Sequence, residues 1–323
     1  MRLWHRLAFA PWHVQLVVTR RCNLSCTYCN EFDEVSDPVP VTELKARLDK
    51  LAELGVFAIE FTGGEPLMHP DLCELIAYAK RLGFVRRSMI TNAYKLNAER
   101  VRALNDAGLT HMQISLDGVE PNDVTVKVLR PLKPKLEVIK AHRRFSVTLS
   151  AVIGAAPAAE VLEVVQYARD NGFKPRVLLL HSQDGQIRIT PEEMKVYADL
   201  QRKLGWRWRE AHDYRSHLAQ GRPAPFKCRA GSRYLYVDEF GIVRWCASTR
   251  EIFGKPLSSY RYEDLVEQFY VEKPCNDRCT LGCVRSDSAV DEWRAQPDRW
   301  NKPRDGRTHL PIAPASAVSE NRS

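Results

Sequence analysis

The sequence has no long apolar run, and this absence excludes one class of protein. Nowhere do ~18 apolar residues follow one another, which is the length that a membrane-spanning helix needs. The first ten residues hold too short a hydrophobic stretch for a secretory signal. We therefore expect a cytoplasmic protein without a transmembrane segment.

Long basic runs are also missing, although the formal net charge is +8. The denser positive groups are short, such as Arg86 with Arg87 and Arg143 with Arg144. A protein that binds nucleic acid would gather Lys and Arg with exposed aromatic residues in one element. Nucleic acid is therefore not expected as a partner, and the charge would suit an anionic substrate instead.

Core-forming residues and cysteines are both plentiful. The chain of 323 residues is 44% hydrophobic and 27% charged, which is typical of globular proteins and allows one large domain or two. Its nine cysteines, without an export signal, argue against a disulfide framework. We expect the thiols to serve in metal binding or redox chemistry.

Three of the cysteines, Cys22, Cys26 and Cys29, fall within eight residues, directly after a β-branched apolar stretch. Soft thiolates at this spacing favour an iron-sulfur cluster, zinc or Cu(I). A four-iron cluster normally takes four thiolates, so three would leave one iron open to another ligand. The alternative is a zinc knuckle completed by a histidine, but no His lies between Cys29 and His69.

Short apolar stretches alternate with segments of helical spacing over the first two thirds of the chain. The pattern predicts strands over 14–19, 57–61, 85–90, 111–116, 146–153 and 176–180, and helices over 41–54, 71–82, 97–107, 134–143, 158–171 and 191–204. Such alternation implies right-handed crossovers and a parallel sheet. The expected fold is α/β, a partial (β/α)6 TIM-like barrel.

Polar residues follow the ends of the predicted strands, where barrel enzymes place their reactive groups. They are Cys22, Cys26 and Cys29 after the first strand, Gly63 to Pro66 after the second, Thr91 and Asn92 after the third, Ser115 and Asp117 at the fourth, Gly154 after the fifth, and His181 and Ser182 after the sixth. We expect these groups to converge on one mouth of the barrel.

The cysteine spacing, with Tyr28 before the last thiol, resembles the cluster motif of the radical S-adenosylmethionine (SAM) superfamily. The run Gly63-Gly64-Glu65-Pro66 is similar to the family's segment that binds the SAM amino group, and a partial six-unit barrel is the family's usual core. The resemblance spans 14–182. It implies reductive cleavage of SAM to a 5′-deoxyadenosyl radical, which abstracts hydrogen from a substrate.

The resemblance also implies roles for individual residues. Cys22, Cys26 and Cys29 would hold a [4Fe-4S] cluster whose open iron binds SAM, and Glu65 would pair with the SAM ammonium. Glycines let a backbone approach a ligand closely. The cofactor-contacting set implied in this way is Gly63, Gly64, Glu65, Pro66, Asn92, Ser115, Asp117 and Gly154. For the segment from Ser115 to Asp117, the alternative interpretation is a turn that ends a strand.

A second group of cysteines follows a change in composition near residue 224. Cys228 and Cys246 flank a predicted β-hairpin that turns at Gly241, and Cys275, Cys279 and Cys283 recur at fourfold spacing. This pattern resembles the SPASM and Twitch extensions of radical SAM enzymes, which carry auxiliary clusters. Five cysteines rather than seven imply one auxiliary [4Fe-4S] cluster, held by Cys228, Cys246 and two of the last three. The alternative is a zinc site that pins the extension to the barrel.

These expectations divide the chain into five parts. They are an N-terminal extension (1–13), the radical SAM partial barrel (14–190), a helical linker (191–223), a SPASM/Twitch-like domain (224–285) and a largely irregular tail (286–323). No catalytic residue can be named from the sequence. Asn92, Arg130 and His181 are candidates that would face the mouth of the barrel.

The primary functional hypothesis is an oxidoreductase that oxidises or rearranges a small molecule, because few residues precede the first strand to bind a peptide leader. The alternative hypothesis is a maturase of a ribosomally made peptide. A more distant alternative is a non-catalytic zinc- or cluster-bearing protein that binds nucleic acid. Either enzyme would need an electron donor such as flavodoxin or ferredoxin.

Overall fold

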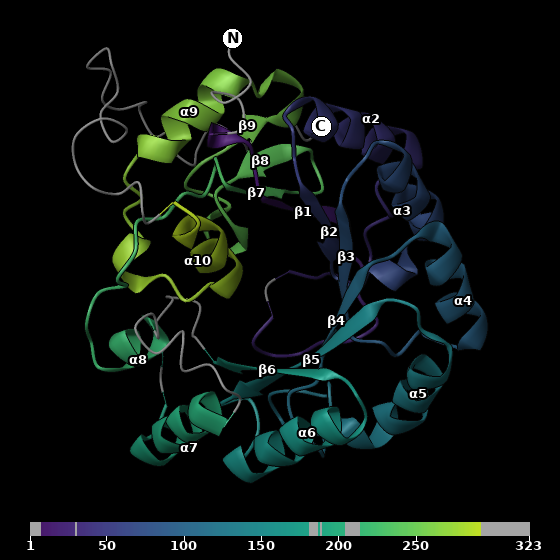
Figure 1. The fold of residues 1–323 in the computed structure, drawn as a ribbon, viewed down its shortest axis with the longest axis vertical. Helices are drawn as coiled ribbons and strands as arrows, with labels where there is room; N and C mark the ends of the chain where they lie inside the picture. The colour runs from purple at the N-terminus through teal and green to yellow at the C-terminus, as the bar shows by residue number, and fades with distance from the viewer. Residues whose placement is uncertain (1–7, 30, 181–186, 188, 204–213, 292–323) are drawn as a thin grey trace.

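The computed structural model describes residues 8–29, 31–180, 187, 189–203 and 214–291. Its strands form one open sheet in the order β6-β5-β4-β3-β2-β1-β7-β8-β9. Figure 1 shows this sheet curving around a central space, with helices along its outer side. Among the described residues, no helix is long and apolar enough to cross a membrane.

The first six strands are parallel, and each is followed by a helix. The units are β1 (His13–Thr19) with α2 (Val41–Glu53), β2 (Ala58–Gly63) with α3 (Leu72–Arg81), β3 (Arg86–Thr91) with α4 (Ala98–Ala107), β4 (His111–Ser115) with α5 (Leu129–His142), β5 (Ser146–Ile153) with α6 (Ala158–Asp170), and β6 (Lys174–Leu179) with α7 (Pro191–Lys203). The partial (β/α)6 barrel expected from the alternation of apolar stretches is confirmed.

Helix α5 begins earlier than the sequence predicts, at Leu129 instead of Pro134. Pro131 lies in the first turn, where the backbone N–H groups have no partner within the helix. Pro134 lies inside the helix, where its ring removes one hydrogen bond. The buried side chains of Leu129, Leu132 and Leu136 continue one apolar face across both prolines, so packing outweighs this local preference.

The two faces of the barrel strands differ in polarity. On β1, Val14, Leu16 and Val18 are fully buried in the main hydrophobic core. Gln15 points to the other side, where its Nε2 donates to Glu60 Oε2 on β2 at 2.8 Å. The inside of the barrel is therefore lined by hydrogen-bonded polar groups, and the apolar core lies between strands and helices.

The C-terminal extension joins the barrel sheet. Strand β7 (Tyr234–Val237) pairs in parallel with β1, and β8 (Ile242–Arg244) and β9 (Lys255–Pro256) continue the sheet in antiparallel fashion. The hairpin was expected from the sequence, whereas its attachment to β1 was not. The remaining helices are α8 (Tyr214–Ala219), α9 (Tyr262–Tyr270) and α10 (Gly282–Ala289), of which α10 lies on the open side of the barrel (Figure 1).

Helix α10 also reaches into the segment that the sequence assigned to an irregular tail. It continues from Gly282 to Ala289, and Asp291 beyond it is buried. The Arg233 guanidinium binds Asp291 through two hydrogen bonds of 2.7 and 3.1 Å. The ordered extension therefore runs at least to residue 291, and 292–323 lie outside the described residues.

Candidate metal and cofactor site

The segment after β1 forms a closed loop that carries three thiols. Its base is fixed by two backbone hydrogen bonds, from Cys22 N to Asp33 O at 3.0 Å and from Asp33 N to Arg20 O at 2.8 Å. At its tip, Cys29 N donates to Cys26 O at 3.1 Å. We call residues 20–33 the cysteine loop, and its two ends are held together at the mouth of the barrel.

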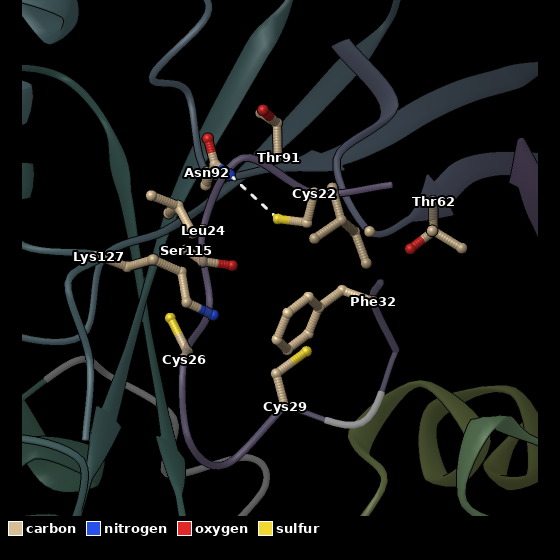
Figure 2. Close-up of a pocket in the computed structure, with 13 residues that line it drawn as sticks. Cys22, Leu24, Cys26, Cys29, Phe32, Thr62, Thr91, Asn92, Ser115 and Lys127 are labelled. Carbon is tan, nitrogen blue, oxygen red and sulfur yellow. Dashed lines mark hydrogen bonds between the residues drawn. The ribbon is translucent and has the colours of Figure 1, made fainter. Parts of the chain in front are cut away.

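The cysteine loop covers a pocket at the carboxyl ends of β1 to β4. Figure 2 shows the three cysteine side chains bordering this space together with the ring of Phe32 and the amine of Lys127. Its lining residues are Cys22, Leu24, Cys26, Cys29, Phe32, Thr62, Gly63, Gly64, Ile90, Thr91, Asn92, Ser115 and Lys127. The structure thus brings the predicted thiols, both glycines, Asn92 and Ser115 to one place.

The spacing of the thiols suits a group larger than one ion. Among the residues with described positions, no three His, Cys, Asp or Glu side chains are close enough to hold a single metal ion. A zinc ion would need its thiolate ligands within about 2.3 Å of one point. Thiolates of a four-iron cluster bind different irons, so they surround a wider space. Three thiols around a pocket with further room are therefore compatible with a cluster that has a position for another ligand.

Burial raises the pKa values of Cys22 and Cys29, and other thiols of the loop add to this effect. Neutral thiols are therefore favoured at these positions until a cation arrives. Metal binding needs thiolates and releases their protons. Binding of a metal at the cysteine loop would accordingly be coupled to deprotonation.

The two glycines at the end of β2 allow the loops to approach closely. Gly64 N donates to Thr19 O at 2.9 Å, and Glu65 N donates to Arg21 O at 2.9 Å. A Cβ atom on Gly64 would lie only 2.3 Å from the carbonyl oxygen of Arg20. Gly63 has φ +139°, a conformation that favours glycine. No larger residue would leave this backbone beside the pocket.

Glu65 is fully buried, and its carboxylate faces the loop after β3. Its Oε1 accepts from Leu67 N at 3.0 Å and from Thr91 Oγ1 at 2.7 Å, and its Oε2 accepts from Asn92 N at 2.7 Å. Burial raises its pKa, and these three donors act against that shift. Since a carboxylate has about four acceptor sites, about one remains for a ligand. Glu65 thus joins two loops and does not line the pocket, unlike the glycines before it. The neighbouring Pro66 begins a short 3-10 helix, Pro66–Met68.

Asp117 lies beside the pocket with one oxygen in use. Its Oδ2 accepts from the hydroxyls of Tyr28 and Thr125, both at 2.7 Å. Its Oδ1 is buried and has no hydrogen-bond partner among the described residues. A buried acceptor of this kind can receive a hydrogen bond from a bound hydroxyl group. The residue therefore fits the hydroxyl-bearing part of a nucleoside.

Asn92 connects the loop after β3 to the cysteine loop. Its Nδ2 donates to Asn23 Oδ1 at 3.1 Å and lies 3.8 Å from Cys22 Sγ (Figure 2). Gly154, in contrast, lies in a turn packed against Leu180 and is not a pocket residue. The structure thus brings Asn92 to the predicted site and leaves Gly154 outside it.

One further candidate from the sequence, Arg130, is not at the pocket. Arg130 is exposed on α5 and forms an ion pair with Glu120. His181 lies outside the described residues.

Lys127 was not identified from the sequence, although its amine lies at the pocket. The amine is 4.6 Å from the centre of the Tyr28 ring. Burial alone would lower its pKa, but Tyr28 and Asp117 outweigh burial and raise it, so the amine is held as a cation. A lysine in an irregular loop carries no periodic signal, and only the folding of 117–128 against the cysteine loop places it here.

The extension gathers a second set of thiols. The pKa of Cys279 is raised well above its usual value by burial and by its neighbours Cys228, Cys246 and Cys275. The side chain of Asn276 accepts from Cys228 N at 2.6 Å and so joins two of the segments that carry them. The structure therefore brings four cysteines of the extension together.

Cys283 has different neighbours: it lies beside Tyr234 and Asp287, and burial raises its pKa to about 11. Cys73, on α3, belongs to neither group of thiols and is partly buried against the main core. Of the three cysteines among which the sequence could not choose, Cys275 and Cys279 are the two whose pKa values are raised by Cys228 as a neighbour.

The radical SAM superfamily model matches residues 16–199, more than half of the chain, and the protein belongs to this superfamily. Membership implies a [4Fe-4S] cluster and SAM as cofactors, in agreement with the thiol pocket. A zinc- or cluster-bearing protein without catalytic activity is accordingly not supported. The chain is an iron-sulfur enzyme of the SAM-dependent class.

The curated relatives of the chain include PqqA peptide cyclases. The chain is 36% identical over 167 residues to the PqqA peptide cyclase of Bradyrhizobium diazoefficiens, covering 50% of this chain and 44% of the relative. It is 32% identical over 180 residues to the PqqA peptide cyclase of Gluconobacter oxydans, covering 54% and 50%. The chain thus spans about half the length of these curated relatives.

The fold is also similar to a solved structure, Streptococcus suis SuiB bound to precursor peptide SuiA. The TM-score is 0.62 with 14% sequence identity, covering 78% of this chain and 64% of that chain. At this identity the likeness concerns the fold alone. The similar part covers more of the chain than the six barrel units alone, which agrees with a sheet that continues into the extension.

Proposed function

We propose that the protein is a radical SAM maturase that oxidises or cross-links a residue of a peptide. The similarity to two PqqA peptide cyclases supports a peptide substrate over the small molecule that the sequence first favoured. The observation that carries the enzymatic part is the pocket in which three thiols meet the glycines at the end of β2. We place the enzyme in the cytoplasm, with flavodoxin or ferredoxin as its electron donor.

Cys22, Cys26 and Cys29 would hold the SAM-binding cluster at this pocket. When bound there, the cluster supplies the electron that cleaves SAM into methionine and the radical that abstracts hydrogen from the substrate. The protein orients these groups and keeps them at the mouth of the barrel. Phe32 and Leu24, which line the pocket, would exclude water from the reacting atoms.

The other pocket residues would bind the parts of SAM. The backbone of Gly63 and Gly64 would face the amino group, with Glu65 and Pro66 shaping this segment from behind. Ser115 and the unused Oδ1 of Asp117 would accept hydrogen bonds from hydroxyl groups of SAM. The amine of Lys127 would form an ion pair with the SAM carboxylate. In addition, Asn92 would hold the cysteine loop over the site, and Gly154 would shape the turn after β5 without contact to the cofactor.

The second thiol group would hold one auxiliary [4Fe-4S] cluster through Cys228, Cys246, Cys275 and Cys279. Four thiolates complete a cluster without an open iron. This ligand set leaves Cys283 free for its contact with Tyr234. We keep the domain bounds expected from the sequence: 1–13 before the barrel, 14–190 as the radical SAM barrel, 191–223 as a linker and 224–285 as the auxiliary region. We add to the auxiliary region residues 286–291, which the sequence assigned to an irregular tail.

The cofactor test uses the full chain, reconstituted anaerobically with iron and sulfide. We expect about eight irons per chain in two four-iron clusters. With a reductant and SAM, the protein should release 5′-deoxyadenosine, measured by chromatography. Bound zinc without SAM cleavage would contradict the enzymatic proposal.

In the substrate test, the reconstituted protein is given synthetic copies of peptides that are encoded beside its gene. In separate reactions it is given metabolites made by the enzymes that neighbouring genes encode. A maturase should convert a peptide into a product that lacks two hydrogen atoms, detected by mass spectrometry. Deuterium placed on the attacked carbon should then appear in 5′-deoxyadenosine. Transfer of deuterium from a metabolite but from none of the peptides would return the assignment to the small-molecule class.

A further inference from the structure

A group of charged side chains lies between the cysteine loop and the extension. It consists of Arg20 and Glu31 of the cysteine loop, Tyr236 of β7, Glu239 of the following turn, and Arg250. We call these five residues the bridge network. Their charges balance as two cations and two anions, and the four charged side chains are between 14% and 22% exposed. Partly buried ion pairs of this kind are weakly screened by salt.

The contacts run from one thiol site toward the other. Glu31, two residues after Cys29, accepts a short hydrogen bond from the Tyr236 hydroxyl. That hydroxyl in turn accepts from Arg250 NH1 at 3.3 Å, and Arg250 lies four residues after Cys246. The cysteine loop and the Cys246 segment are therefore two hydrogen bonds apart through a single tyrosine.

Glu239 holds the other end of the network. Arg250 NH2 donates to both of its carboxylate oxygens at 2.6 Å, and Arg20 Nε lies 3.8 Å from Oε1. The turn that carries Glu239 is itself fixed, because Arg47 of α2 donates to its backbone oxygen at 3.0 Å. Through Glu239, Arg250 is thus linked to α2 of the barrel while it also contacts Tyr236.

One carboxylate oxygen of the bridge network lies just beyond hydrogen-bond distance of two guanidinium groups. Glu31 Oε1 is buried and accepts no hydrogen bond from any described residue. The guanidinium groups of Arg250 and Arg20 lie 3.9 and 4.0 Å from it, beyond hydrogen-bond distance. A small movement of the cysteine loop would convert either long ion pair into a hydrogen bond. The network can therefore respond to the position of the loop.

We propose that Tyr236 and Arg250 are positioning residues that couple the placement of the cysteine loop to the segment carrying Cys246. Both residues act through Glu31, and neither lines the pocket under the cysteine loop. The inference rests on the proposed function for the identity of the bound groups, but the coupling itself is a property of the chain. Since coupling between two sites is reciprocal, occupation of either site should steady the other.

The main test compares Tyr236→Phe with Tyr260→Phe in the reconstituted full chain. Tyr260 is an equally buried tyrosine of the extension, but its hydroxyl donates to Gly231 O and not to the cysteine loop. Loss of a hydrogen bond to a charged group changes an equilibrium by about tenfold or more. We expect Tyr236→Phe to speed hydrogen exchange of residues 22–34 and to raise the dissociation constant for SAM, each by about tenfold. Tyr260→Phe should change neither by more than about twofold.

Reciprocity gives a second readout that does not depend on catalysis. Added SAM should slow hydrogen exchange over 242–250 in the parent protein, and this protection should disappear in Tyr236→Phe. Arg250→Lys, which keeps the charge but cannot bind both oxygens of Glu239, should weaken the protection. Equal exchange in Tyr236→Phe and Tyr260→Phe at both segments would overturn the coupling. Failure of the parent protein to cleave SAM would instead contradict the proposed function, because exchange of residues 22–34 is measured without a reductant.

Discussion

The two thiol sites differ in how they are enclosed. At the cysteine loop, Cys26 is buried and Cys22 and Cys29 are partly exposed, and all three border a pocket that has room for another ligand. In the extension, Cys228 and Cys246 are buried, Cys275 and Cys279 are partly exposed, and burial raises the pKa of Cys246 to about 12. Under the proposed ligand sets, the first is an open site with a position left for another ligand, and the second is a closed site with four thiolates.

The largest effect is expected from replacing Cys22, Cys26 and Cys29 together by Ala. SAM cleavage should fall to background because the open site loses all of its thiolates. Iron content should fall from about eight to about four per chain, since the closed site remains. Cys73→Ala, which changes a thiol outside both sites, serves as the control. Loss of all iron in the triple variant would break the distinction between two independent sites.

The closed site is tested by a matched pair of single substitutions. Cys279→Ala should lose about four irons, because it removes one of four grouped thiols. Cys283→Ala should keep about eight, since Cys283 faces Tyr234 and Asp287 instead. Iron content and the electron paramagnetic resonance spectrum of the reduced protein measure both. Equal losses in the two variants would show that Cys283 is a ligand.

A substitution beside the open site should have a smaller and more local effect. In Gly64→Ala the new Cβ would meet the backbone oxygens of Arg20 and Arg21 at 2.3 and 2.5 Å. Overpacking against backbone atoms costs about 1 to 3 kcal/mol, and it should displace the cysteine loop. We expect iron loss from the open site alone and a lower melting temperature. Gly254→Ala is the control for a crowded glycine away from the open site, because its Cβ would meet the Arg244 side chain instead of the cysteine loop.

The smallest effect concerns His13 and the carboxylates beside it, on the polar side of the barrel sheet. Burial alone would lower the pKa of His13, but Glu60 and Asp287 outweigh burial and raise it to about 9. Glu60 is the main counter-ion, because its own pKa is lowered to about 2 whereas burial raises that of Asp287.

A histidine with a raised pKa contributes stability that is full below its unfolded value of about 6.5 and is lost as pH rises through 9. The free energy of unfolding should therefore fall by about 1 to 3 kcal/mol between these values. Chemical denaturation measured across this range should show the slope in the parent protein and a shallower slope in His13→Gln. His142→Gln, at an exposed position, should leave it unchanged. An unaltered slope in His13→Gln would assign the effect to another group.

The barrel and the open site could be predicted because their signals are local. Periodicity defined the six units, and the loops after parallel strands meet at one mouth, so Cys22, Gly64 and Ser115 could be placed together. Lys127 could not, because a single lysine in an irregular loop has no repeating pattern. The choice among the last three cysteines was equally out of reach. Their even spacing is alike, and only the packing of α10 against β7 places Cys283 beside Tyr234.

The attachment of the extension was missed for a related reason. Strand β7 pairs with β1 across more than two hundred residues of sequence, from His13 opposite Tyr234 to Leu16 opposite Val237. Both strands are short and apolar, and such stretches do not reveal their partners. Register is decided by tertiary contacts, including the hydrogen bond from the Tyr234 hydroxyl to Gln15 Oε1 at 2.5 Å.

The continuous sheet sets a condition on exchanging parts between enzymes of this kind. Removal of the extension would leave β1 as an edge strand, with unpaired backbone groups along a row of apolar side chains. Such an edge invites pairing with other chains. A transplanted extension would have to bring its own strand in the register of Tyr234 with His13, so barrel and extension are best recombined as one folding unit.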